Sequence, residues 1–240
     1  MKIITVDDYQ QMSRLAADII CQTVKDNPFA TLGLATGSTV LGTYAKLIKA
    51  CAGGEVSFAN VKAVNLDEYV GLDNNHPQSY AFYMRNNLFD LIDIDEMNTF
   101  IPCGTAENIA DECDGYNNLL NLIPRDLQLL GIGSDGHVAF NEPGSPFDSR
   151  TRVVQLHPST VKDNSRHFVC IGDVPTSAIS MGIADIMSAK KVLLLASGES
   201  KAQAVKDMVQ GAVTEACPAS ILQRHPDVTV ILDKDAASLL

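Results

Sequence analysis

Short apolar runs alternate along this chain with stretches in which apolar residues recur at helical spacing. The apolar runs predict strands over Lys2–Thr5 (the weakest of the six), Ala30–Ala35, Val61–Asn65, Asp126–Gly131, Lys191–Ala196 and Val228–Leu232. The helical spacing predicts helices over Asp8–Lys25, Val40–Cys51, Tyr80–Leu88, Asn108–Leu122 and Ser200–Gln210. This alternation of strand and helix is typical of an α/β protein.

Two of the predicted strands have the composition of a buried, parallel sheet. Leu127, Leu129, Leu130 and Ile132 form one near-continuous apolar run and Val192–Leu195 forms another, as in strands covered on both faces. Strand–helix–strand units connect with a right-handed crossover. We therefore expect a parallel-dominated sheet with helices on both sides, in a single domain over residues 1–240.

The segment Pro143–Ile179 interrupts this alternation. It contains Pro146, Pro158 and Pro175, which disfavour regular helices and central strands. We expect the segment to leave the sheet and to contain a lid that closes over a ligand, within residues 143–179.

Composition and charge exclude several classes of protein. The chain has 240 residues, 46% of them hydrophobic, which is enough to bury a large core. Its 18 Lys and Arg against 29 Asp and Glu give a net charge of −11, so nucleic acid is a poor partner. No apolar stretch approaches the ~18 residues of a membrane span. Asp7 and Asp8 stand where a signal peptide would have its apolar core, and we expect a cytoplasmic protein.

The six cysteines carry no recognisable motif. They lie at least ten positions apart and include no C-x-x-C pair. Neither a zinc site nor a thioredoxin-type dithiol is indicated, and we expect no disulfides.

Four polar loops follow predicted strands. These loops are Thr36–Thr39, Leu66–Tyr69, Gly133–His137 and Ser197–Lys201. In open α/β sheets, ligands bind in the crevice beyond the carboxyl ends of the strands. The four loops therefore indicate a functional site at that edge of the sheet.

The loop Thr36-Gly37-Ser38-Thr39 has the features of an anion site. Gly37 allows backbone N–H groups to approach an anion closely, and the helix start adds unpaired N–H groups and a partial positive charge. Ser38 or Thr39 could equally be a simple helix cap. No Lys follows Gly37 as it would in a nucleotide-binding P-loop, so the expected anion is the phosphate monoester of a small molecule.

Asp135, His137 and Glu142 form the group of residues in this chain that is most typical of a catalytic site. The glycines of Gly131–Gly136 match the dinucleotide pattern G-x-G-x-x-G only formally, because Pro143 soon follows where that pattern needs a helix. Two carboxylates can fix the tautomer of a histidine and raise its pKa, which suits proton transfer near neutral pH. The same residues could instead bind a metal ion, or be incidental charges of a solvated loop.

Two acidic and two basic residues complete the candidates. Asp67 and Glu68 follow the strand Val61–Asn65, where one acid could cap a helix. A carboxylate that faces a histidine is also what proton abstraction beside a carbonyl requires.

Lys201 follows a strand, and Arg166 lies in the segment Pro143–Ile179. Either could be solvated, but in so acidic a chain both are candidates for a phosphate clamp.

Together these loops resemble the glucosamine-6-phosphate deaminase family over essentially the whole chain and in the same order. The most specific part is the run Gly131–Arg152 (GIGSDGHVAFNEPGSPFDSRTR). The other matching segments are Leu34–Thr39, Asn65–Leu72, Ser79–Tyr80, Met181–Asp185, Ser197–Ala202 and Pro218–Asp233.

This resemblance implies a three-layer α/β/α, Rossmann-like fold. It also implies the reaction of glucosamine 6-phosphate with water to give fructose 6-phosphate and ammonia, without a metal or an organic cofactor. His137 would assist ring opening, Asp67 would move a proton between carbons 2 and 1, and Asp135 and Glu142 would orient and tune His137. The phosphate site would comprise Thr36, Gly37, Ser38, Thr39, Arg166 and Lys201.

Two rival functions share this fold. 6-Phosphogluconolactonases carry a related Asp-Gly-His turn, but Asp67–Tyr69 and Phe140–Pro143 favour the deaminase. A non-catalytic sugar-phosphate sensor would have no use for Asp67, Asp135, His137 and Glu142 together.

The chain departs from the hexameric members of the family, which the resemblance associates with activation by N-acetylglucosamine 6-phosphate. Ser145 and Arg152 match that regulatory site, but Pro146 and Val154 replace a serine and a lysine. We therefore expect no such activation, and a monomer or a small homo-oligomer that acts on a small molecule, with no nucleic-acid or membrane partner.

Overall fold

The computed structural model describes residues 1–157, 161, 165, 168, 170 and 173–240. Its centre is a seven-stranded sheet with the spatial order β1 (Lys2–Val6), β10 (Val228–Asp233), β9 (Val192–Ala196), β6 (Leu127–Leu130), β2 (Thr31–Leu34), β3 (Lys62–Asn65) and β5 (Thr99–Phe100). All neighbouring strands in this sheet run parallel. The expected parallel sheet is thus confirmed with all six predicted strands. Only the two-residue edge strand β5 was missed in it.

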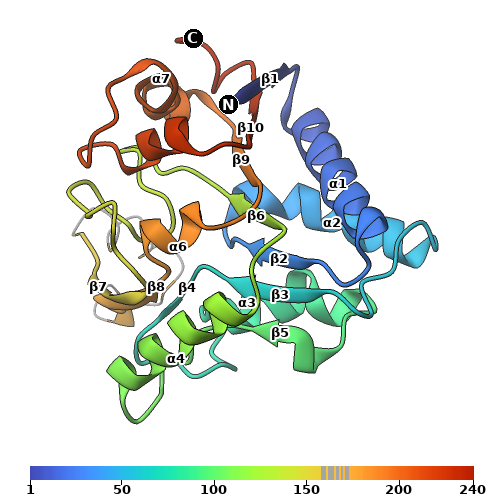
Figure 1. The fold of residues 1–240 in the computed structure, drawn as a ribbon, viewed down its shortest axis with the longest axis vertical. Helices are drawn as coiled ribbons and strands as arrows, with labels where there is room; N and C mark the ends of the chain where they lie inside the picture. Colours follow the sequence, from blue (N-terminus) through green and yellow to red (C-terminus); the bar gives the residue numbers. More distant parts are fainter. Residues whose placement is uncertain (158–160, 162–164, 166–167, 169, 171–172) are drawn as a thin grey trace.

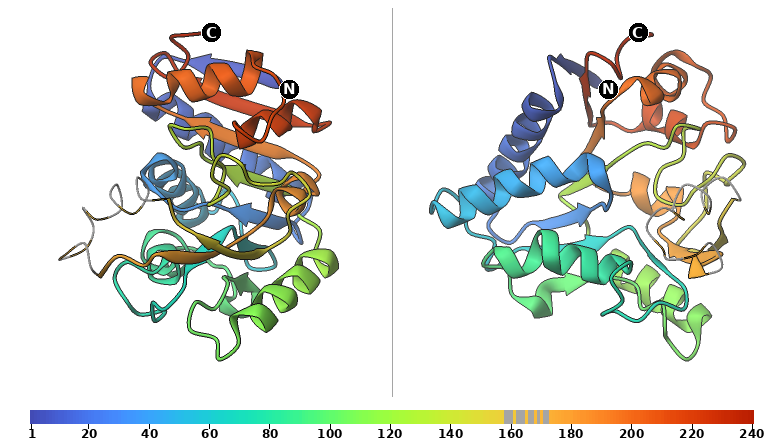
Figure 2. Two further views of the ribbon diagram at one scale, coloured as in Figure 1. Left: turned by 90° about the vertical axis from the view of Figure 1, so that its left-hand side faces the viewer. Right: turned by 180° about the vertical axis from the view of Figure 1, so that it is seen from behind.

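Helices cover both faces of this sheet. In the described residues, the α-helices are α1 (Tyr9–Asp26), α2 (Leu41–Ala52), α3 (Tyr80–Asn87), α4 (Ile109–Leu122), α6 (Ile183–Met187) and α7 (Ala202–Gln210). Short 3₁₀ helices are η1 (Ser38–Val40), η2 (Phe89–Leu91), η3 (Glu96–Asn98), η6 (Glu199–Lys201) and η7 (Pro218–Arg224). α1 packs against α2 on one face, whereas α4 and α7 lie on the other (Figures 1 and 2). The three-layer fold and the five predicted helices are confirmed.

A second, smaller sheet stands beside the first. It pairs β4 (Asp67–Tyr69), β8 (Ser177–Ser180) and β7 (Arg152–Gln155) in antiparallel fashion, with β8 in the middle. The sequence analysis missed these strands, since β4 is buried although it reads Asp-Glu-Tyr and shows no apolar run. The prediction that the segment Pro143–Ile179 leaves the main sheet is confirmed, because β7 and β8 belong to the smaller sheet.

The lid expected within residues 143–179 stays a prediction, as does the single-domain assignment. Residues 158–160, 162–164, 166–167, 169 and 171–172 of that segment lie outside the described part of the chain.

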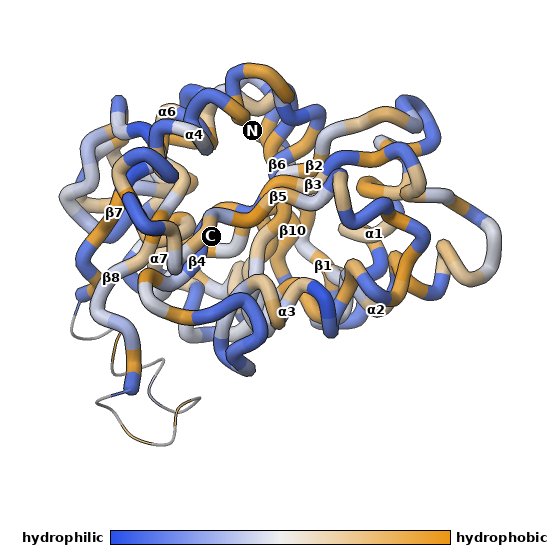
Figure 3. The backbone as a smooth tube through the Cα atoms, turned by 90° about the horizontal axis from the view of Figure 1, so that it is seen from below, coloured by the Kyte–Doolittle hydropathy of each residue, from blue (hydrophilic) through white to orange (hydrophobic). Residues whose placement is uncertain are grey.

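The central strands form the middle of the hydrophobic core. Leu129 and Leu130 of β6 and Leu194 and Leu195 of β9 are completely buried, and so is Ile231 of β10. Figure 3 shows hydrophobic positions along the strands and hydrophilic ones on outer loops. No disulfide joins any of the cysteines in the part of the chain that the structure describes. Among those same residues, no helix is both long and apolar enough to cross a lipid bilayer.

Candidate active site

A cavity of about 740 Å³ opens at the carboxyl ends of β2 and β6. These strands are neighbours, but the chain leaves them toward opposite sides of the sheet, so the crevice lies where the connections diverge. The volume lies within the ~300–1,000 Å³ range typical of small-molecule sites. Residues from all four predicted loops line the cavity, including Thr36–Thr39, Asp67, His137 and Lys201.

The loop after β2 presents its backbone to this cavity. Gly37 has φ of 105°, a left-handed conformation that a residue with a side chain rarely adopts. The chain then forms η1 and α2, whose first N–H groups have no acceptor within the helix. An anion in the cavity would therefore meet the positive end of a helix dipole. This geometry agrees with the predicted anion site.

The loop after β9 has nearly the same backbone shape but different partners. Gly198 has φ of 90° and is followed by η6 and α7, just as Gly37 is followed by η1 and α2. Its N–H donates to the Asp233 carboxylate at 3.0 Å, and Ser197 Oγ donates to the same carboxylate. An internal carboxylate thus occupies the position that an external anion would need here. What this loop adds to the cavity is the Lys201 side chain.

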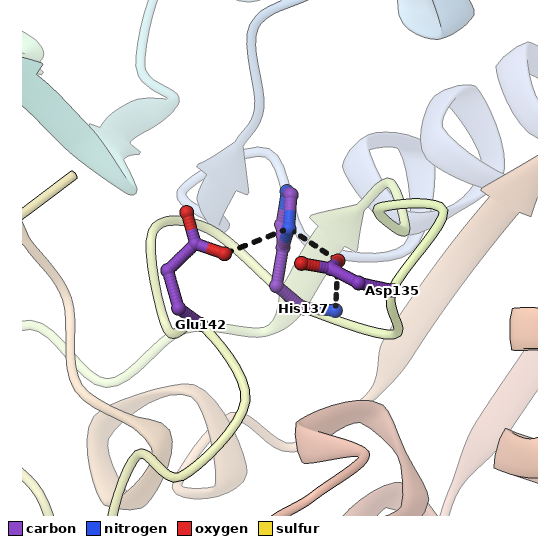
Figure 4. Close-up of side chains that lie close together, drawn as sticks. All are labelled: Asp135, His137 and Glu142. Carbon is purple, nitrogen blue, oxygen red and sulfur yellow. Dashed lines mark hydrogen bonds and ion pairs between the residues drawn. The ribbon is translucent and has the colours of Figure 1, made fainter. Parts of the chain in front are cut away.

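The loop after β6 holds His137 between two carboxylates (Figure 4). His137 Nδ1 lies 2.7 Å from Asp135 Oδ1 and 3.6 Å from Glu142 Oε2. Neither contact has the geometry of a linear hydrogen bond, so both are ion pairs in character. A Cβ atom at Gly133 would lie 2.3 Å from the His137 ring, which explains why a glycine is needed there. The structure brings these three predicted residues together, and His137 is the member that lines the cavity.

The surroundings of His137 control its charge. Burial of the ring by itself would lower the His137 pKa, but the ion pairs with Asp135 and Glu142 outweigh this and raise it to about 9. The interaction with His137 in turn holds the Asp135 pKa well below its usual range. The ring is therefore protonated at neutral pH, while its second nitrogen remains directed away from the carboxylate pair (Figure 4).

The same three residues could also hold a divalent cation. One ligand atom from each of Asp135, His137 and Glu142 lies within 4.8 Å of the other two. A protonated imidazole already offsets one of the two carboxylate charges, so this geometry fits proton transfer as well as it fits metal binding.

The structure assigns different positions to the two adjacent acids of β4. Glu68 is completely buried, and its carboxylate accepts hydrogen bonds from the backbone N–H groups of Tyr80 (2.9 Å) and Ala81 (2.9 Å) at the start of α3. Glu68 therefore caps a helix. Asp67 instead lines the cavity that His137 also borders. The structure thus assigns the capping position to Glu68 and places Asp67 on the cavity, and the catalytic role of Asp67 stays a prediction.

Asp67 is a stronger base than an ordinary aspartate. Its burial, together with the nearby Glu68 charge, raises the Asp67 pKa to about 8, although the positive charge on His137 opposes this shift. A carboxylate with a pKa near neutrality accepts a proton from a weakly acidic carbon more readily than an ordinary aspartate does.

Aromatic side chains that the sequence analysis did not assign form one wall of the cavity. Tyr69, Tyr80 and Phe140 lie in contact, with the Tyr69 ring centroid 5.0 Å from that of Tyr80 and 5.7 Å from that of Phe140. They come from β4, α3 and the loop after β6, so no sequence spacing links them. Arg166, the second predicted cation of the phosphate site, lies outside the described residues.

Asn141 is a further residue that only the structure reveals. It is completely buried beside Glu142, and its side-chain amide donates to the backbone carbonyls of Val138 (3.0 Å) and Met181 (2.8 Å). Its oxygen accepts a bond from Arg152 Nη1 at 3.0 Å. Arg152, which the resemblance placed in a regulatory site, here supports the turn that carries Glu142.

Known proteins with similar sequences match the chain over its whole length. A glucosamine-6-phosphate deaminase of Clostridium perfringens (strain SM101 / Type A) is 48% identical to this chain over 241 residues, which cover 100% of both chains. Glucosamine-6-phosphate deaminase 1 of Bacillus subtilis (strain 168) is 47% identical over 240 residues, which cover 100% of this chain and 99% of the relative.

Solved structures of related proteins have the same fold as this chain. A structure described as a monomeric glucosamine-6-phosphate deaminase matches with a TM-score of 0.98 and 47% identity over 100% of both chains. A 6-phosphogluconolactonase from Trypanosoma cruzi matches with a TM-score of 0.82 and 23% identity over 100% of this chain and 96% of that one, which shows a shared fold alone. The family model of glucosamine-6-phosphate isomerases and 6-phosphogluconolactonases matches residues 7–231. The chain therefore belongs to the glucosamine-6-phosphate isomerase/6-phosphogluconolactonase family.

Proposed function

We propose that this protein is a glucosamine-6-phosphate deaminase, which converts α-D-glucosamine 6-phosphate and water into D-fructose 6-phosphate and ammonia in amino-sugar catabolism. The observation that carries the proposal is one cavity bordered by a buried Asp67, by His137 and by a helix-start loop suited to phosphate. Relatives of this name match the whole chain at nearly half identity.

The phosphate of the substrate lies at the loop after β2. Backbone N–H groups of Thr36–Thr39 bind its oxygens, and Lys201 supplies a positive charge from the opposite side of β6. Arg166 is proposed as a third contact on the resemblance alone. In a chain with a net charge of −11, such local donors have to overcome the overall repulsion of an anion.

His137 opens the pyranose ring. Its imidazolium, stabilised by Asp135 and Glu142, donates a proton to the ring oxygen while the C1–O5 bond breaks. The anomeric hydroxyl gives up its proton to water as the carbonyl forms at carbon 1. Asp135 and Glu142 act through the histidine, because neither lines the cavity. The open-chain aldehyde then lies within reach of Asp67.

Asp67 carries the proton between the two reacting carbons. It removes the proton from carbon 2, which the adjacent carbonyl makes acidic, while the oxygen at carbon 1 takes up a proton from water. It then returns the first proton to carbon 1. The imine left at carbon 2 is hydrolysed by water to the ketone, and ammonia leaves. The raised pKa of Asp67 supports this assignment, since the base has to hold the proton between the two steps.

This chemistry requires neither a metal ion nor an organic cofactor. Proton transfer among Asp67, His137 and water accounts for each step, and activity should survive dialysis against EDTA. Loss of activity that zinc or magnesium restores would instead assign Asp135, His137 and Glu142 to a metal site.

We also propose a cytoplasmic monomer without activation by N-acetylglucosamine 6-phosphate. A relative of high similarity is described as monomeric. Val154, at the position of the activator-binding lysine, packs against the small apolar cluster that contains Tyr69 and Phe140. A sigmoidal rate curve that becomes hyperbolic on adding N-acetylglucosamine 6-phosphate would contradict this part of the proposal.

The experiment offers the purified protein a panel of substrates and measures ammonia and fructose 6-phosphate. Glucosamine 6-phosphate should release both, and unphosphorylated glucosamine at the same concentration should not. Equal efficiency on the two would refute the phosphate site. Hydrolysis of 6-phosphogluconolactone without ammonia release from the amino sugar would favour the other activity of the family.

A further inference from the structure

Three tyrosine hydroxyls bind the backbone of the predicted phosphate loop. Tyr44 of α2 donates to the carbonyl oxygen of Ala35, and Tyr83 of α3 donates to that of Gly37 at 2.8 Å. Tyr9 of α1 donates to the carbonyl oxygen of Ser38 at 3.0 Å. Helices α1, α2 and α3 thus each contribute one hydroxyl to the peptide groups between Ala35 and Thr39.

These bonds fix the directions of backbone N–H groups. In a planar trans peptide, the carbonyl of one residue and the N–H of the next point in opposite directions. A hydroxyl that holds the Gly37 carbonyl therefore also fixes the Ser38 N–H. In the same way, the bonds to Ala35 and Ser38 fix the N–H groups of Thr36 and Thr39.

Tyr9 also holds the beginning of α2. Its hydroxyl accepts a hydrogen bond from the Gly42 N–H at 2.8 Å while it donates to Ser38. The helix can approach Tyr9 this closely because residue 42 is a glycine. A Cβ atom at this position would lie only 2.9 Å from the Tyr9 ring. The loop and the helix start are thereby tied together through one oxygen atom.

Tyr83 connects this loop to the reacting end of the cavity. It lies on α3, whose first two N–H groups bind the carboxylate of Glu68, the residue next to Asp67. Asp67 is therefore connected to Gly37 in three steps: the peptide bond to Glu68, the helix α3 that Glu68 caps, and the Tyr83 hydroxyl on that helix. Such a rigid connection sets the spacing between a bound phosphate and the base.

We propose that Tyr83, together with Tyr9 and Tyr44, positions the phosphate loop and fixes its distance from Asp67. The inference rests on the proposed function, since it assigns a role to the loop that binds the substrate phosphate. These tyrosines are positioning residues, because they act on the ligand through the backbone that they hold. Loss of one hydroxyl should allow the loop to rotate and should weaken phosphate binding more than it slows the chemistry.

The test removes single hydroxyls and measures binding of inorganic phosphate by calorimetry, with steady-state kinetics on glucosamine 6-phosphate. Tyr83→Phe should weaken phosphate binding about 3- to 10-fold, the loss of about one hydrogen bond, and should raise KM by a similar factor. We expect kcat to stay within about twofold. Tyr9→Phe together with Tyr83→Phe should weaken binding further than either change alone.

Tyr116→Phe is the matched control. Tyr116 is buried whereas Tyr83 is half-buried, but its hydroxyl likewise donates to a backbone carbonyl, that of Asn65 at 2.7 Å, and it does not contact the phosphate loop. This variant should melt at a lower temperature with phosphate affinity unchanged. The same pattern in Tyr83→Phe, a lower melting temperature with unchanged phosphate affinity and KM, would overturn the inference.

The two proposals can fail separately. Deamination by the parent protein with unchanged phosphate binding in Tyr83→Phe would refute the positioning role and leave the function standing. Weakened phosphate binding in Tyr83→Phe with no deamination by the parent protein would refute the function and support the positioning role.

Discussion

The loops after β2 and β6 lie on neighbouring strands and border one cavity, but they carry different kinds of charge. The loop after β2 offers backbone N–H groups and a helix dipole, whose partial charges do not depend on pH. The loop after β6 and the adjacent β4 offer His137 and Asp67, with pKa values of about 9 and about 8. Both of those groups titrate within the range in which enzymes work.

This difference separates binding from reaction. A phosphate can be held by donors that need no particular protonation state, so its binding should depend little on the ionisation of the protein. Proton transfer requires groups that both gain and lose a proton, and only buried, paired side chains provide this near neutrality. Changes at the phosphate end should therefore alter KM, and changes at the reacting end should alter kcat and its pH dependence.

The largest expected effect is that of Asp67→Asn. The substitution removes the base that acts in the transition state, so kcat should fall about 10²- to 10⁴-fold while KM changes less than about threefold. Exchange of the carbon 2 proton with solvent should disappear as well. A variant that retains kcat within about threefold of the parent would show that the base lies elsewhere. His137→Gln should have a smaller effect, because amino-sugar phosphates open spontaneously to some extent.

The pH dependence tests the same end of the cavity without a substitution. Asp67 has to be ionised, so kcat/KM should rise about tenfold per pH unit toward pH 8, and it should fall again above pH 9 as His137 loses its proton. In His137→Gln the alkaline fall should vanish. The rise should then move to higher pH, because the cation that lowers the Asp67 pKa is gone. Binding of sulfate, whose charge is constant in this range, should vary much less.

The same two groups should make thermal stability depend on pH. Both have folded-state pKa values above their unfolded values of about 3.8 and 6.5, so the folded state holds their protons more tightly. Their contribution is complete at low pH and is lost as the pH rises through about 8 and about 9. The melting temperature should fall between pH 6 and pH 10, and it should fall less in Asp67→Asn. An equal fall in the parent and the variant would contradict the raised Asp67 pKa.

At the phosphate end, Lys201→Ala should raise KM about 10- to 100-fold and leave kcat within about threefold. A charge-assisted hydrogen bond to a charged group is worth about 1.5–3 kcal/mol, which corresponds to such a factor. Lys234→Ala is the control, since Lys234 forms an exposed ion pair with Asp7 at 2.6 Å and does not line the cavity. Equal KM values for the two variants would remove Lys201 from the phosphate site.

The smallest expected effect compares the two glycine loops. Gly37 and Gly198 both have positive φ values, and a Cβ atom at either would meet no other atom, so alanine should strain both turns similarly. Gly37→Ala and Gly198→Ala should therefore lower the melting temperature by similar amounts. Phosphate affinity should fall several-fold only in Gly37→Ala, because the Gly198 N–H is already bound to Asp233. A matching loss in both variants would mean that both loops bind the anion.

Much of the fold follows from local properties of the chain. The apolar runs located the six main strands and the helical spacing located five helices. A strand buried on both faces gives a continuous apolar run, whereas a helix buried on one face gives apolar residues at a spacing of three to four positions. Strand β4 was missed because its sequence, Asp-Glu-Tyr, is polar although the strand is buried. Its burial depends on contacts with distant segments, which leave no local pattern in the sequence. The cluster of Asp135, His137 and Glu142 was predictable, because all three belong to one turn that glycines keep tight.

What the sequence determined by itself was the edge of the sheet at which the site lies, and the chemical types of the groups there. Only the tertiary structure decided that Glu68 caps α3 while Asp67 faces the cavity, although the two are adjacent and chemically alike. It also decided that Asp233 satisfies the loop after β9, and that tyrosines from α1, α2 and α3 hold the loop after β2. The physical reason is that a hydrogen bond or a pKa depends on which groups meet in space, and the hydrogen-bond partners that hold these two loops lie up to 46 residues apart in the chain.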